Sequence, residues 1–126
     1  MALHNELEIY RSCYTLLGAA GEVIMQMRRD AKKVFGEMII NGCVEPDLHI
    51  RAANMAQDKE PHLLRLLERL EVIELLLRTC RDNRYIAVSH FARLVMLTQS
   101  IGKQANGWRR MGRGEQVQQQ RLFPGG

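Results

Sequence analysis

The 126-residue sequence contains no run of about 18 consecutive apolar residues, the length that a membrane-spanning helix requires. Its first residues, MALHNELEIYR, lack the basic start and apolar centre of a secretory signal peptide. Cysteines are few and odd in number, and Cys13, Cys43 and Cys80 have no metal-binding spacing such as Cys-x-x-Cys. Each lies among apolar helical positions. We therefore expect reduced, buried thiols in a cytoplasmic protein that makes no membrane contact.

Residue patterns of common catalytic sites are also missing. The sequence has no glycine-rich phosphate loop, no HExxH motif and no carboxylate pair at the spacing of a glycosidase. The four histidines fall on different segments, at His4, His49, His62 and His90. These absences predict that the protein is not an enzyme and has no catalytic residue.

Three glutamates on one helical segment raise the alternative of a metal site, because carboxylates inside a helical bundle can bind two metal ions. The Glu-x-x-His spacing that accompanies such sites is absent. We interpret these carboxylates as charge partners of arginines on the same helix. The glutamates are Glu68, Glu71 and Glu74, and the arginines are Arg65, Arg69 and Arg78. We therefore expect neither a metal ion nor another cofactor.

The most apolar stretch is LLRLLERLEVIELLL, residues 63–77, in which ten of fifteen residues are Leu, Val or Ile. A single seam at intervals of three and four residues is typical of an amphipathic helix. The seam consists of Leu63, Leu66, Leu70, Ile73 and Leu77. Val72, Leu75 and Leu76 add a second apolar surface on another side of this helix. The second surface indicates that another chain covers it, and hence an oligomer.

Three more segments have helical periodicity, so that four helices are expected, at about residues 4–27, 28–56, 61–80 and 86–110. Because short corners make consecutive helices antiparallel, the sequence predicts an all-α, up-and-down four-helix bundle over residues 1–112. Beyond it, the Gln/Gly-rich composition of residues 113–126 predicts a flexible tail.

Turn-forming residues set the expected helix ends and irregularities. Asp58 is the predicted N-cap of the third helix, and Asn83 its C-cap. Asn41-Gly42 and Pro46 predict a kink or a break near residues 41–46, because proline removes a helical hydrogen bond. Gly102 and Gly107 cost the fourth helix about 1 kcal/mol each relative to alanine, which favours a close approach of another backbone.

Positive charge gathers after three of the helices, within a net charge of +4 at pH 7. In an up-and-down bundle, the clusters after the first and third helices share one end, and the cluster after the fourth lies at the other end. The candidate residues for binding nucleic acid or a protein partner are Arg28, Arg29, Lys32, Lys33, Arg78, Arg81, Arg84, Arg109, Arg110 and Arg113. The alternative is that these cations pair with Asp30, Asp82 and nearby glutamates and contribute little.

Several groups of residues together carry a family resemblance. They are Ile9-Tyr10 with Tyr14, Leu16 and Leu17; Gly36 with Ile39; Ala53-Asn54 with Ala56 and Asp58-Lys59; the leucine-rich helix that ends in Arg78; and Ile101-Gly102 with Gly107-Trp108. In these groups the chain resembles the accessory variability determinant (Avd-like) four-helix bundle proteins of diversity-generating retroelements, over about Leu7 to Arg110. The sequence departs from the family at Asn41-Gly42 and Pro46, where family members have a continuous helix.

The resemblance implies a ring-like homo-oligomer, a homopentamer, with a basic surface. It further implies a non-catalytic accessory subunit that binds the reverse transcriptase of the retroelement, the template RNA and the cDNA, and that supports error-prone cDNA synthesis in mutagenic retrohoming. Two alternatives stay open. One is a four-helix bundle protein of the type encoded in ribosomal-RNA intervening sequences, and the other is a purely structural helical oligomer without nucleic-acid binding.

Overall fold

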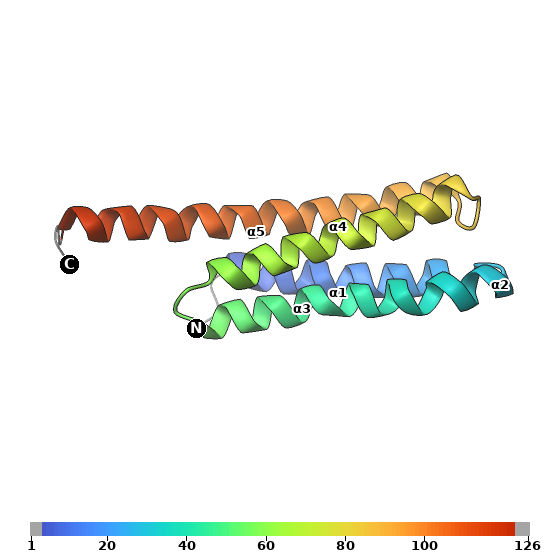
Figure 1. The fold of residues 1–126 in the computed structure, drawn as a ribbon, viewed down its shortest axis with the longest axis horizontal. Helices are drawn as coiled ribbons and strands as arrows, with labels where there is room; N and C mark the ends of the chain where they lie inside the picture. Colours follow the sequence, from blue (N-terminus) through green and yellow to red (C-terminus); the bar gives the residue numbers. More distant parts are fainter. Residues whose placement is uncertain (1–3, 123–126) are drawn as a thin grey trace.

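The computed structural model describes the backbone of residues 4–122 and the side chains of residues 8–114, and over this range it contains helices and turns but no strand (Figure 1). The elements are α1 (His4–Met25), α2 (Arg29–Ala31), the π-helical turn η1 (Lys32–Gly36), α3 (Glu37–Met55), α4 (Glu60–Asp82) and α5 (Val88–Leu122). Because α2, η1 and α3 follow one another without a gap, they form one long helical segment. The protein is therefore a bundle of four helical segments, as the sequence predicts.

Each long helix packs against two others: α1 and α4 both contact α3 and α5. Contacts between α1 and α5 show that these neighbours are antiparallel. Ser12 accepts a hydrogen bond from Nε2 of Gln104 at 3.0 Å, and Glu22 pairs with Arg93 at 3.1 Å, so that later residues of one helix meet earlier residues of the other. The expected up-and-down order of the helices is confirmed.

The apolar seam of α4 forms the buried side of that helix, and all five of its predicted residues are buried. Leu16 of α1, Ile39 and Ile50 of α3 and Ile101 of α5 are buried with them in one continuous core. The predicted second surface of α4 behaves differently. Leu75 is 59% exposed and Val72 is 40% exposed, whereas Leu76 packs at the edge of the core. Within one chain, most of the second apolar surface is uncovered.

Of the kink or break expected near residues 41–46, the break is wrong, because α3 runs as an α-helix through Pro46 to Met55. Tertiary packing overrides the local preference. The Pro46 ring is fully buried in the core, and the residue four positions earlier, whose carbonyl a helical proline crowds, is Gly42. A Cβ atom on Gly42 would lie only 3.3 Å from Cγ1 of Ile73, so the glycine lets α3 and α4 approach each other. Gly42 is therefore a point of contact between α3 and α4.

The fourth helix is longer than expected. The sequence predicts an end near Arg110 followed by a flexible tail, but α5 continues to Leu122. In Figure 1 its last turns extend beyond the ends of the other helices. Glu, Gln, Arg and Leu are good helix formers, and adding residues to an existing helix avoids the cost of nucleation. The rest of the predicted tail, residues 123–126, lies outside the described residues.

The close backbone approach expected at Gly102 and Gly107 is absent within the chain. A Cβ atom on Gly102 would meet only side-chain atoms of Leu70 and Leu67, at 3.8 and 3.9 Å, which is ordinary van der Waals contact. A Cβ atom on Gly107 would meet only the Arg110 side chain, at 4.0 Å. Neither glycine is required by the packing of a single copy.

The three cysteines are buried and form no disulfide, as expected. Burial raises the pKa of the Cys13 and Cys43 thiols to about 12. Among the described residues, no helix combines the length and the apolar character needed to cross a membrane.

Candidate functional site

The clusters of cations after α1 and after α4 meet at one end of the bundle. The guanidinium of Arg28, before α2, lies 5.7 Å from the ring centroid of Tyr85, after α4. Phe35 of η1 contacts the same tyrosine, with 5.6 Å between the ring centroids. Seven of the predicted residues therefore share this end, which we call the basic end: Arg28, Arg29, Lys32, Lys33, Arg78, Arg81 and Arg84.

The start of the second helical segment brings four of these cations together. Arg28 is the N-cap residue and has an extended backbone, but its side chain makes no capping hydrogen bond. Within the helix, the carboxylate of Asp30 accepts a hydrogen bond from the backbone N–H of Ala31 at 3.0 Å. Lys32 and Lys33 follow in the π-helical turn, a feature that occurs frequently at functional sites. Because cations at a helix start oppose the macrodipole, local helix stability does not account for this cluster.

The end of α4 positions the other cations through a tight C-terminal motif. Asn83 is the C-cap residue, as predicted, and Arg84 follows in the left-handed region with φ of 61°. The N–H of Tyr85 donates to the carbonyl of Cys80 at 2.8 Å, and the N–H of Arg84 donates to that of Arg81 at 3.0 Å. This is the Schellman pattern, in which glycine is the usual left-handed residue. An L-residue there costs roughly 1–2 kcal/mol, so an exposed arginine is held at a strained position.

Carboxylates neutralise only part of the basic end. Arg28 lies 3.6 Å from Asp30, and Arg81 lies 3.0 Å from its neighbour Asp82. Exposed pairs of this kind contribute about 0–1 kcal/mol, which agrees with the alternative reading of these two arginines. The other five cations have no ion pair among the described side chains. Of these, Lys32 donates to the carbonyl of Met25 at 3.5 Å, at the end of α1.

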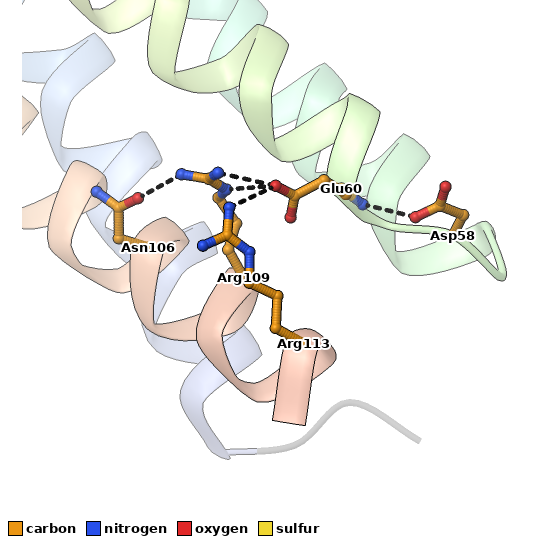
Figure 2. A network of polar contacts seen from close by, with 5 residues as sticks. All are labelled: Asp58, Glu60, Asn106, Arg109 and Arg113. Carbon is orange, nitrogen blue, oxygen red and sulfur yellow. Dashed lines mark hydrogen bonds and ion pairs between the residues drawn. The ribbon is translucent and has the colours of Figure 1, made fainter. Parts of the chain in front are cut away.

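The predicted cations at the opposite end behave differently, because a single carboxylate holds two of them (Figure 2). Arg109 donates to Oε1 of Glu60 from Nε and Nη2, at 3.0 and 2.8 Å, and Arg113 donates to the same oxygen at 3.2 Å. Asn106 accepts from Nη1 of Arg109 at 3.0 Å, and Asp58 accepts from the backbone N–H of Glu60 at 3.2 Å. We call these five residues the Glu60 network.

The Glu60 network fastens α5 to the start of α4. The hydrogen bond from Arg109, followed by the one from Arg113, lowers the pKa of Glu60. The Arg109 side chain is only 19% exposed, so it is poorly placed to contact a phosphate. The prediction of Asp58 as the N-cap is wrong by one residue, because the N-cap position belongs to Lys59, and Asp58 instead accepts from the N–H of the first residue of α4. Of the three cations predicted here, only Arg110 is without an ion pair among the described side chains.

Lys59 stabilises the turn before α4 by donating hydrogen bonds to backbone carbonyls. Its Nζ atom donates to the carbonyls of Ala53 at 3.0 Å and Ala56 at 3.1 Å, at the end of α3. The same ammonium lies 5.9 Å from the centroid of the Trp108 ring of α5. Together with the Glu60 network, this contact indicates that the second end of the bundle is a structural joint.

The expected pairing between the glutamates and the arginines of α4 is wrong, because no ion pair joins them among the described side chains. Arg69 forms an ion pair with Glu45 of α3, and Glu74 accepts a hydrogen bond from the buried hydroxyl of Thr98 in α5, at 2.7 Å. Both partners lie on other helices because α4 is flanked on two sides in the bundle. His49 lies near Arg69 and Glu45, and its pKa is lowered mainly because its side chain is partly buried.

The sequence reading missed the aromatic rings of the basic end. Tyr85 contacts Arg28, and Phe91 of α5 lies under Arg81, with 4.2 Å from the guanidinium carbon to the ring centroid. A signal was available, because Tyr85 directly follows the Arg81–Arg84 corner. Phe35 and Phe91 read only as members of apolar stripes.

Within the described residues, no three side chains of His, Cys, Asp or Glu are grouped in a way that could hold a metal ion. The residues that the fold does gather are cations and aromatic rings at one end, and an ion-paired joint at the other. Comparisons of this chain with protein-family models, with curated proteins and with solved structures found no match.

Proposed function

We propose that this protein is a non-catalytic subunit that binds nucleic acid through its basic end. The observation that carries the proposal is that two corners distant in sequence place seven cations at one end, five of them without a carboxylate partner among the described side chains. A phosphate backbone gains affinity from each cation that displaces condensed counterions. The uncompensated cations and the strained Arg84 are a stability cost that such a ligand would offset.

The narrower proposal follows from the family resemblance. In this proposal the protein is an Avd-like accessory subunit of a diversity-generating retroelement, works in the cytoplasm, and binds the reverse transcriptase, the template RNA and the cDNA during error-prone synthesis. The packing supports a structural role for the most specific motif residues. Lys59, from the Ala53–Lys59 corner, contacts Trp108, from the end of the Ile101–Trp108 motif. The continuous α3 also removes the departure at Pro46.

A homo-oligomer, a pentameric ring in the narrower proposal, is supported by apolar side chains that one copy leaves uncovered. They lie on α3 and α4 and include Met38, Leu48, Val72 and Leu75. Repeating the basic end around a ring would multiply weak phosphate contacts into tight binding. The same exposed side chains favour the second candidate function, a purely structural helical oligomer, and nucleic-acid binding distinguishes the two.

The decisive experiment measures the affinity for a fluorescently labelled RNA between about 50 and 200 mM salt. Arg29→Glu with Lys33→Glu reverses two exposed cations of the basic end that have no ion pair. The matched control is Arg11→Glu with Lys103→Glu, which makes the same charge change at exposed positions elsewhere on α1 and α5. Circular dichroism and light scattering verify that both variants keep the helicity and the oligomer size of the parent.

We expect the basic-end variant to bind at least about tenfold more weakly and to show a shallower salt dependence, by about 0.7 in log–log slope for each lost phosphate contact. The control variant keeps most of the affinity. Equal affinity of the parent and the basic-end variant throughout the salt range would mean that the basic end does not bind nucleic acid. In that case the structural oligomer is the better reading.

A further inference from the structure

The basic end contains more than charge, because two of its guanidinium groups lie over aromatic rings. Arg81 is 4.2 Å from the centroid of the Phe91 ring. Arg28 is 5.7 Å from the centroid of the Tyr85 ring, which also contacts Phe35. These pairs join three parts of the chain: the two corners and the first turn of α5. Phosphate binding alone requires the charges but not the rings.

Each of these two guanidinium groups also lies near a carboxylate. Asp82 lies 3.0 Å from Arg81, and Asp30 lies 3.6 Å from Arg28. A ring near one face of a guanidinium and a carboxylate near its edge favour orientations that leave the other planar face toward solvent. The rings themselves are half-buried. The basic end thus displays flat, preorganised groups next to cations without an ion pair.

Fold stability does not explain this arrangement well. Arg28 is 69% exposed, and a cation–π contact at such an exposed position contributes little. Tyr85 is moreover positioned by Arg84, whose left-handed backbone opposes stability. Costs of this kind are typical of functional surfaces.

We infer that the basic end binds single-stranded nucleic acid in preference to a duplex. Unpaired bases stack on the Tyr85–Arg28 and Phe91–Arg81 pairs, and the five cations without a carboxylate partner hold the phosphates between them. Every base has a π face, so stacking on aromatic rings and guanidinium planes is tolerant of sequence. A duplex hides these faces and offers phosphates alone. This inference rests on the proposed function and specifies its ligand.

The test compares three ligands on the full chain: single-stranded RNA and single-stranded DNA of about 12 nucleotides each, and the DNA duplex of the same sequence. Tyr85→Leu and Phe91→Leu remove a ring but keep an apolar side chain, and Tyr85→Phe keeps the ring. Tyr14→Leu is the matched control, because Tyr14 is an exposed ring in the middle of α1, away from the basic end. Helicity and thermal melting are measured for every variant.

We expect each of the two leucine variants at the basic end to weaken single-strand binding about tenfold, since base–aromatic stacking is worth about that factor or more per base. Duplex binding stays unchanged, and Tyr85→Phe and Tyr14→Leu bind as the parent does. If the parent binds strand and duplex equally, and the leucine variants weaken neither, the inference is wrong while the proposed function stands. If the parent binds none of the ligands at low salt, the proposed function itself fails.

A second measurement avoids any dependence on the folding of the variants. Single-stranded RNA that contains 4-thiouridine is cross-linked to the unaltered protein by ultraviolet light, and the attachment sites are mapped by mass spectrometry. Cross-links at Tyr85 or Phe91 support stacking at the basic end. Cross-links confined to other parts of the protein would overturn it.

Discussion

Arg109 of α5 donates two hydrogen bonds to one carboxylate oxygen of Glu60, at 3.0 and 2.8 Å, although the two residues are 49 positions apart (Figure 2). This pair joins the start of α4 to α5 at the end of the bundle where charge is compensated. Arg109, which the sequence predicts to bind nucleic acid or a protein partner, therefore has a structural role.

Stability should therefore depend on the ionisation of Glu60. The pKa of Glu60 in the folded state lies below its ordinary value of 4.5. The pairing therefore stabilises the fold fully above pH 4.5. This stabilisation is lost as the pH falls from 4.5 through the pKa of the folded state. We expect Glu60→Gln to lower the melting temperature at pH 7 and to melt nearly as the parent does below the folded pKa. Thermal melts of both proteins from pH 7 to pH 3 measure this. A difference in melting temperature that stays constant over this pH range would contradict it.

Arg84 separates the effect of backbone strain from that of charge. Glycine adopts φ of 61° without a steric cost, so Arg84→Gly should stabilise the fold by about 1 kcal/mol, a rise of about 4 °C in melting temperature for a chain of this size. Arg84→Ala removes the same charge but keeps the strain, so it should not stabilise. If the two variants melt alike, the left-handed conformation is not a source of strain. Under the proposed function, both should bind RNA more weakly than the parent.

Gly102 reports on packing between copies of the chain. Alanine there would meet Leu70 and Leu67 at ordinary contact distances, and it improves helix propensity by about 1 kcal/mol. We expect Gly102→Ala to raise the stability of one isolated copy by roughly that amount, measured by urea unfolding at low protein concentration. Destabilisation that increases with protein concentration would instead show that the backbone of a second copy lies against Gly102.

The proposed oligomer should depend on the exposed side of α4. Val72→Glu with Leu75→Glu places charge on its uncovered apolar surface and should reduce the particle mass in light scattering without loss of helicity. Met96→Glu, at an exposed position of α5, is the control. A parent protein that scatters as a 14.5 kDa monomer at micromolar concentration would refute the oligomer.

The buried thiols should be inert until the bundle opens. Burial raises the pKa of Cys13 and Cys43 to about 12, so almost no thiolate forms at neutral pH, and the thiolate is the reactive species. We expect modification by iodoacetamide at pH 8 to be no faster than unfolding. Mass spectrometry over a urea series checks this, with free cysteine as the control for reagent activity. Rapid labelling of Cys13 in the native protein would contradict its burial.

The sequence by itself determined the helical class and the core side of α4. Leu66 and Ile73 recur with helical periodicity, and that local pattern is enough to predict which side is buried. Short corners likewise determined that helices alternate in direction, and hence that Arg28 and Arg84 lie at the same end. These predictions depend only on neighbouring residues and on chain connectivity.

Only the tertiary structure decided which local preferences prevailed and which charges are paired. The helix through Pro46 persists because its ring is buried and because Gly42 admits Ile73 of α4. Arg109 is paired because the carboxylate of Glu60 reaches α5 from another helix, whereas no carboxylate among the described side chains pairs with Arg29. The energies of burial and of ion pairing depend on contacts between side chains that are far apart in the sequence. A local pattern of residues does not show which of these contacts form.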